Sequence, residues 1–157
     1  MKKLLKLLID KNLTICACES FTGGLFANEI TNIPNASKVF SGSLVTYSIE
    51  SKTNIVDVKK ETLENYTTVS SQVALQMAKG ALKKFNSDIC VSFTGNAGPG
   101  PSDNPNIGLG FIAIVTSDFE KVIKIELKIN SRKKIKKLAV KICVEQLIYY
   151  IKNDFHN

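Results

Sequence analysis

The sequence predicts an α/β fold, a three-layer α/β/α domain whose mixed, mostly parallel sheet lies between two layers of helices. Short apolar runs that resemble buried strands alternate with helical patterns as far as residue 93. A hairpin pattern then follows within residues 110–129. The length of 157 residues fits one domain, which we place at residues 1–157, and is enough to bury a sizeable core.

The individual elements follow from hydrophobic periodicity and from residues that break it. A basic and apolar segment at residues 1–8 predicts an amphipathic first helix. Further helices are expected at residues 22–31, 70–85 and 131–152, and a short helix or turn at each of residues 47–55 and 61–66. Strands are expected at residues 13–18, 38–46, 88–93, 110–116 and 122–129, with Gly42 as a possible bulge in the second. In the helix over 70–85, the expected inward-facing residues are Val73, Met77, Ala81 and Leu82.

Three segments leave predicted strands on what we expect to be one edge of the sheet. They cover residues 20–24, 47–52 and 94–101. Ligands of open α/β sheets bind at the carboxyl ends of the strands, so these segments predict one shared site. The third segment opens a loop running to about Asn106, and five of the nine glycines lie between residues 95 and 110. A loop of this length in a compact domain is usually functional.

The cysteines, the single histidine and the apolar runs argue against metal sites, histidine-based catalysis and membrane-spanning helices. The four cysteines have no zinc spacing and fit buried reduced thiols, and the single histidine, His156, lies in the C-terminal tail. We therefore expect no metal, no cofactor and no histidine-based catalytic triad. No apolar run approaches the ~20 residues of a membrane-spanning helix, and residues 1–8 are too short for a signal peptide. We expect a cytoplasmic protein with no membrane association.

The charge is unevenly distributed. Residues 121–157 hold ten basic and three acidic residues, which accounts for the whole net charge of +7. An anionic partner, small or large, is expected. Nucleic-acid binding is the weaker interpretation, because the lysines fit one solvated helix face and no aromatic residues are interleaved to stack on bases.

Two candidate catalytic residues come from this reasoning, each with a structural alternative. Ser20 stands at a strand-to-helix turn, where it can cap the helix or act as a nucleophile whose oxyanion backbone N–H groups receive. Lys52 can serve as a general base for Ser20 if its amine is neutral, or it can be a surface lysine. Arg132 is the only arginine and could bind phosphate in bidentate fashion, or be retained by chance. The glycine-rich loop after Phe93 can form a phosphate cradle or a structural turn.

Four motifs together resemble the CinA C-terminal family, in matching order and spacing over about residues 5–150. They read ACESFTGG, GSLVTYSIESK, SFTGNAGP and SRKKI. Members of that family that act as enzymes are nicotinamide-nucleotide amidases, which hydrolyse nicotinamide mononucleotide to nicotinate mononucleotide and ammonia with a Ser/Lys mechanism and no metal.

The resemblance implies a role for each matching residue. Ser20 would be the nucleophile, Lys52 the base, and Tyr47 a proton relay or an orienting hydroxyl. The implied substrate-binding residues are Thr22, Gly23, Gly24, Thr94, Gly95, Ala97, Gly98 and Arg132. The expected partner is a small phosphorylated substrate, and we also expect a homo-oligomer.

The chain departs from the family pattern in four places. Phe21 stands where the family usually has Cys, Ile49 where it has Asn, and Ser71 where it has Glu, and the loop over 99–109 differs. These changes concern the substrate more than the fold. The alternative function is a non-catalytic relative that binds a phosphorylated nucleotide or a partner protein.

Overall fold

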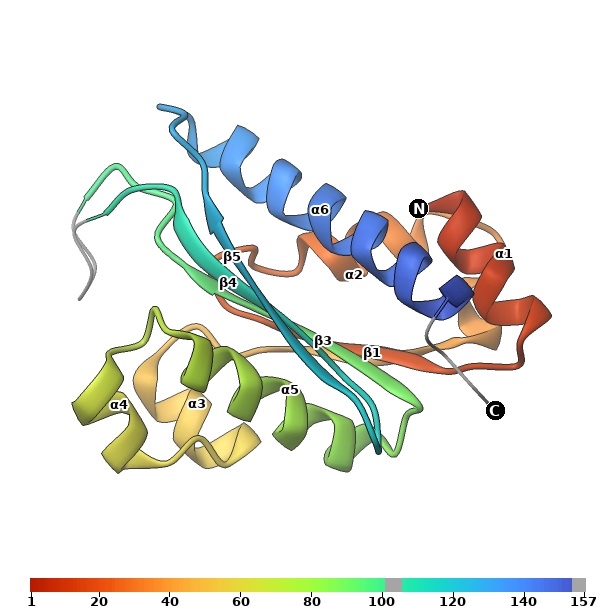
Figure 1. Ribbon diagram of the computed structural model, residues 1–157, viewed down its shortest axis with the longest axis horizontal. Coiled ribbons are helices and arrows are strands. Elements are labelled where there is room, and N and C mark those ends of the chain that lie inside the picture. Colours follow the sequence, from red (N-terminus) through yellow and green to blue (C-terminus); the bar gives the residue numbers. More distant parts are fainter. Residues whose placement is uncertain (101–105, 154–157) are drawn as a thin grey trace.

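The protein folds around one five-stranded sheet, described here from a computed structural model that covers residues 1–100 and 106–153. The strand order is β2-β1-β3-β4-β5 (Figure 1). The strands are β1 (Ile15–Glu19), β2 (Phe40–Val45), β3 (Ile89–Gly95), β4 (Leu109–Val115) and β5 (Glu120–Glu126). All five lie where the hydrophobic pattern predicts them, within a few residues at each end.

The sheet is mixed, as expected, but it is not mostly parallel. Strand β1 pairs in parallel with β2 and β3, whereas β3 with β4 and β4 with β5 are antiparallel. Parallel neighbours need a crossover, usually a helix. The described residues of the connection between β3 and β4, 96–100 and 106–108, form no helix, and β4 returns beside β3 in the opposite direction. The bulge expected near Gly42 is present, because the pairing of β1 with β2 skips Ser41.

Helices cover both faces of the sheet (Figure 1). One face carries α1 (Lys2–Asp10), α2 (Leu25–Thr31) and α6 (Arg132–Asn153), and the other carries α3 (Ile49–Val56), α4 (Lys60–Tyr66) and α5 (Ser71–Phe85). A short 3-10 turn, η1 (Ala36–Lys38), precedes β2. None of the helices in residues 1–100 and 106–153 combines the length and the apolarity that crossing a membrane requires.

Each face has its own hydrophobic core, because side chains alternate along a strand. Ile15 and Ala17 of β1 belong to the cluster beneath α1, α2 and α6, whereas Cys16 and Cys18 belong to the cluster beneath α5. The expected inner face of α5 is confirmed for three residues buried against the second cluster, while the fourth, Leu82, is half-buried at its edge; the three are Val73, Met77 and Ala81. His156 lies outside the described residues.

The register of the parallel strands determines where the site forms. Glu19, the last residue of β1, is opposite Val45 of β2 and Phe93 of β3. The three strands therefore reach the same edge of the sheet together, and the segments that follow them leave at one place. This confirms the convergence that the sequence predicts.

Candidate active site

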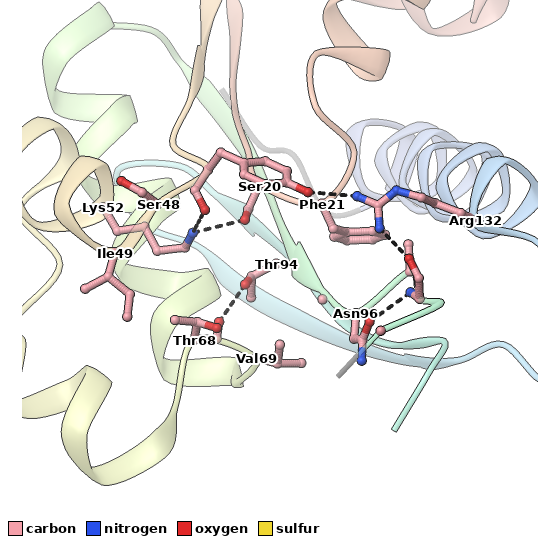
Figure 2. A pocket seen from close by; sticks show the side chains of 15 residues that line it. Ser20, Phe21, Ser48, Ile49, Lys52, Thr68, Val69, Thr94, Asn96 and Arg132 are labelled. Atoms are coloured by element: carbon pink, nitrogen blue, oxygen red, sulfur yellow. Dashed lines mark hydrogen bonds between the residues drawn. The ribbon is translucent and has the colours of Figure 1, made fainter. Parts of the chain in front are cut away.

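A cavity of about 510 Å³ lies at this edge of the sheet (Figure 2). It is bordered by the segments that follow β1, β2 and β3, by the loop before α5 and by the start of α6. Its lining residues are Ser20, Phe21, Tyr47, Ser48, Ile49, Lys52, Thr68, Val69, Thr94, Gly95, Asn96, Ala97, Gly98, Gly100 and Arg132.

The side chains of Ser20 and Lys52 meet at the inner end of the cavity. Lys52 Nζ lies 3.0 Å from Ser20 Oγ, and it donates to the carbonyl oxygens of Thr46 at 2.8 Å and Tyr47 at 3.4 Å. Lys52 is only 2% exposed and Ser20 8% exposed. The expectation of a surface lysine is therefore wrong, and the expected Ser–Lys proximity is present.

Helix α3 places Lys52 by local rules. Ser48 caps the helix, with its hydroxyl accepting from Ser51 N at 3.1 Å, while Ser51 Oγ accepts from Ser48 N at 3.0 Å. This reciprocal capping box fixes where the helix begins. Lys52 then lies one turn before Val56 on the buried face, because residues four apart share a helix face. The long side chain runs along that face toward Ser20.

A thiol close to this pair is chemically inert. Cys18 is buried, and its Sγ lies 3.3 Å from the Thr46 hydroxyl. Burial raises the pKa of the Cys18 thiol to about 12, although the Thr46 hydrogen bond acts to lower it. The thiolate is the reactive form of cysteine, so Cys18 is not an available nucleophile at ordinary pH.

The turn between Ser20 and α2 differs from the sequence expectation. Helix α2 is capped by Gly24, so Ser20 is not its cap. Its N–H groups at Phe26 and Ala27 donate to the Glu19 carboxylate at 3.1 and 3.0 Å. These two N–H groups are therefore not among the donors that the sequence offers for an oxyanion at Ser20.

The motif residues that follow Phe21 stand back from the cavity. Thr22 is buried, and its hydroxyl has no hydrogen-bond partner within residues 1–100 and 106–153. Gly23 and Gly24 adopt φ of 61° and 88°, values that residues with a side chain rarely adopt. This backbone conformation explains the two glycines better than the close approach of a ligand does. The N–H of Gly23 already donates to Ser20 O at 3.0 Å. None of these three residues lines the cavity, so their substrate-binding role stays a prediction without support from the lining.

A chain of hydrogen bonds spans the opposite end of the cavity (Figure 2). Arg132 donates from Nη1 to Gly98 O at 2.6 Å and from Nη2 to the Tyr47 hydroxyl at 2.8 Å. Gly98 N in turn donates to Asn96 Oδ1 at 2.8 Å. Tyr47 is 61% exposed, so this end is open to solvent. Arg132 and the glycine-rich loop thus face one cavity, as the sequence predicts.

The remaining predicted binding residues border the cavity from β3. The Thr94 hydroxyl donates to Thr68 O at 2.6 Å, and Ala97 is buried in the loop beyond it. A side chain at Gly95 would come within 2.9 Å of the backbone of Gly110 on β4. The close pairing of two strands is therefore a structural reason for that glycine, whatever its contact with a ligand.

With this geometry described, comparison with known proteins identifies the family. Residues 1–151 match the family described as the CinA C-terminal domain. The chain belongs to this family. It is 41% identical over 146 residues to a competence-damage inducible protein of Caldicellulosiruptor saccharolyticus, covering 92% of this chain and 35% of that protein. A relative of the same name from Clostridium botulinum is 51% identical over 110 residues, covering 69% of this chain and 27% of that protein.

Solved structures agree with the fold. The competence/damage-inducible protein CihA of Agrobacterium tumefaciens has a TM-score of 0.89 at 32% identity, covering 94% of this chain and 91% of that one. The competence damage-inducible protein A of Klebsiella pneumoniae has a TM-score of 0.93 at 23% identity, covering 98% and 96%. The chain spans about a third of the length of the curated relatives, whereas it spans nearly all of these structures.

Three of the four departures from the CinA pattern border the cavity, the loop over 99–109 through Gly100. Phe21 is buried beside the loop after β3, and Ile49, 52% exposed, stands at the rim one turn before Lys52. Ser71 begins α5 and does not line the cavity. The altered loop over 99–109 falls partly on residues 101–105, which lie outside the described residues.

Sequence reasoning did not single out Thr68 and Val69. They precede α5, and its N-cap Ser70 is the only local signal at that place. The cap predicts where the helix begins but not that the preceding residues border a cavity. Their position depends on the packing of α5 against the sheet, which no short motif records.

Proposed function

We propose that this chain is a nicotinamide-nucleotide amidase that hydrolyses nicotinamide mononucleotide through Ser20 and Lys52. The observation that carries the proposal is the 3.0 Å contact between a buried lysine amine and a serine hydroxyl at the inner end of a cavity. Histidine-free serine hydrolases use such a lysine as the base. Membership of the CinA C-terminal domain family supports the same chemistry.

The acylation step begins with a neutral Lys52 amine. Burial favours the uncharged form of a lysine, and the amine hydrogens can be donated to the carbonyls of Thr46 and Tyr47. The nitrogen lone pair then faces the Ser20 hydroxyl and takes its proton as the serine oxygen attacks the carboxamide carbon. The same proton passes to the leaving nitrogen, and ammonia departs as the acyl ester forms.

Hydrolysis of the ester repeats this chemistry with water. Lys52 takes a proton from water, the hydroxide attacks the ester carbon, and Ser20 recovers its proton as nicotinate mononucleotide leaves. For the oxyanion of both steps we propose the backbone N–H of Phe21, the residue after the nucleophile. Phe21 lines the cavity, and no acceptor for its N–H is found in residues 1–100 and 106–153.

Recognition of the nucleotide is assigned to the outer end of the cavity. A guanidinium has more N–H donors than the two that Arg132 uses for Gly98 and Tyr47, and its planar fork matches phosphate. The bonds to Gly98 and Tyr47 hold the guanidinium at the rim. A phosphate there leaves the nicotinamide end of the molecule to reach inward to Ser20.

The test is ammonia release from nicotinamide mononucleotide by purified protein with a chelator present. Turnover by the wild-type chain that is lost in Ser20→Ala supports the proposal. Absence of turnover, together with measurable binding of nicotinamide mononucleotide or nicotinate mononucleotide, points instead to a non-catalytic relative that binds a phosphorylated nucleotide. The exposed Ile49 at the rim is the observation that favours this second candidate, because it puts an apolar side chain in the cavity wall next to Lys52.

A further inference from the structure

The carboxylate of Glu19 is the least expected group near the nucleophile. Glu19 immediately precedes Ser20 and is fully buried, and alternation along β1 puts it on the same face as Ala17, which packs beneath α2 and α6. A buried carboxylate costs free energy unless hydrogen bonds or opposite charge compensate it. Its Oε2 accepts from Phe26 N at 3.1 Å, and its Oε1 accepts from Ala27 N at 3.0 Å and from Ser43 Oγ at 3.3 Å.

These contacts tie the strand to the helix across the turn that carries Ser20. The first N–H groups of a helix favour an anion, and here the anion comes from the residue before the nucleophile. The backbone is held on the same side, since Ser20 N donates to Phe93 O at 2.9 Å and Gly23 N donates to Ser20 O at 3.0 Å. The N–H groups of Phe26 and Ala27 at the start of α2 are therefore bonded to the protein's own carboxylate and are not available to a substrate.

The backbone of Glu19 is also connected to Lys52 through hydrogen bonds of Thr46. Its carbonyl accepts from Thr46 N at 2.9 Å, and the carbonyl of Thr46 accepts from Lys52 Nζ at 2.8 Å. One residue thus connects the strand that delivers the nucleophile, the helix after it and the segment that orients the lysine. No substrate contact is needed for this role, because Glu19 does not line the cavity.

We propose that Glu19 is a positioning residue that occupies the amino end of α2, fixes the turn over residues 20–24 and thereby directs the Ser20 hydroxyl at Lys52. The proposal rests on Ser20 as nucleophile but not on the identity of the substrate. It also assigns the amino end of α2 to the protein's own carboxylate, so the anionic group of a substrate binds elsewhere in the cavity.

The experiment compares Glu19→Gln with Asp88→Asn. Asp88 is a control for the hydrogen bonds, although it is exposed where Glu19 is buried. Its carboxylate accepts from the backbone N–H and the hydroxyl of Thr14, at the opposite end of the strand ladder from Ser20. Both changes replace a carboxylate by an amide of the same shape. Gln can keep one of the two N–H bonds of Glu19 but turns its NH₂ group toward the other donor.

The first readout is steady-state turnover of nicotinamide mononucleotide per folded protein. We expect kcat of Glu19→Gln to fall by about 10–100-fold with KM changed by less than about threefold, because a displaced nucleophile slows chemistry more than binding. Asp88→Asn should keep kcat and KM while also lowering the unfolding midpoint. Equal kcat in wild type and Glu19→Gln would overturn the proposal.

Two further readouts do not depend on the substrate. A fluorophosphonate probe bonds its phosphorus to Ser20 Oγ with loss of fluoride while the proton passes to Lys52, and its rate should fall in Glu19→Gln. A crystal structure of that variant should show a longer distance between Ser20 Oγ and Lys52 Nζ. Retention of the 3.0 Å contact overturns the inference even if nicotinamide mononucleotide is not hydrolysed by wild type. Glu19→Asp, which keeps the charge with a shorter reach, replaces Glu19→Gln if the latter does not fold.

Discussion

The two ends of the cavity differ in their access to water. At the inner end, Ser20 and Lys52 are 8% and 2% exposed, whereas Tyr47 at the outer end is 61% exposed and bonded to an exposed Arg132. Electrostatic interactions strengthen away from water, and an uncharged lysine is favoured there. An exposed cation, by contrast, can meet an anionic ligand from solution. We therefore expect the inner pair to govern kcat and the outer pair to govern KM.

Ser20→Ala should have the largest effect and tests whether the inner pair governs kcat. We expect hydrolysis of nicotinamide mononucleotide to fall by ~10⁴-fold or more, because no other nucleophile replaces the hydroxyl. The fold should persist, since Ser20 holds the turn through its backbone N–H and carbonyl and does not cap α2. Ammonia release and thermal unfolding measure the two outcomes. Wild-type activity in a folded Ser20→Ala protein would remove Ser20 from the mechanism.

Lys52→Met tests the other half of the inner pair. Methionine fills a similar volume without the amine, and we expect kcat to fall by about 10²–10⁴-fold, the usual contribution of a general base. Wild-type kcat should rise with pH through the titration of Lys52, and the variant should lose that rise. Lys83→Met, at an exposed position on α5, is the control for replacing a lysine. A variant that retains the wild-type pH profile would contradict the assignment.

Arg132→Lys tests the outer end. The charge stays, but the planar fork that can bind a phosphate and Gly98 O together is lost. We expect KM for nicotinamide mononucleotide to rise by about tenfold with little change in kcat, a loss typical of one charge-assisted hydrogen bond. The unphosphorylated riboside should be a poor substrate for wild type. If the substitution weakens turnover of riboside and nucleotide equally, Arg132 does not bind the phosphate.

Tyr47→Phe should have a smaller effect and separates two roles for the hydroxyl. It removes the acceptor of the 2.8 Å bond from Arg132, and we expect KM to rise by about twofold to fivefold, the cost of one exposed hydrogen bond. A proton relay would instead lower kcat. Kinetics of the variant with nicotinamide mononucleotide therefore decide between an orienting hydroxyl and a relay.

The last prediction concerns stability at high pH rather than catalysis. The thiol of Cys18 has a pKa of about 12 in the folded protein because of burial, above the ordinary value near 8.5 that it regains on unfolding. Above pH ~8.5 the unfolded chain releases this proton and the folded chain does not, so stability falls by up to about 1.4 kcal/mol per pH unit until pH ~12. Cys18→Ala should reduce that slope in unfolding experiments. An unchanged slope would show that Cys18 does not contribute to it.

The contrast between these residues also shows what could be predicted. Local patterns were sufficient for the strands, for the helix over 70–85 and for the grouping of Ser20, Tyr47 and Lys52 around one site, whereas Arg132 was assigned to that site by the family resemblance. They were not sufficient for Glu19. Its place in a buried strand predicts that it is buried, but not that its carboxylate accepts hydrogen bonds from the start of α2. Nor did they predict Thr68, which reaches Thr94 only through the packing of distant segments.

Neighbours within a few positions were enough to set the order of elements, the antiparallel hairpin of β4 and β5, the capping of α3 and α5, and the residue types at the strand ends. Contacts in the folded molecule were needed to establish that β3 and β4 are antiparallel, that Lys52 is buried, and that Thr22 to Gly24 stand outside the cavity. Those properties depend on strand register and on how helices rotate against the sheet. Both are set by contacts between residues far apart in the chain.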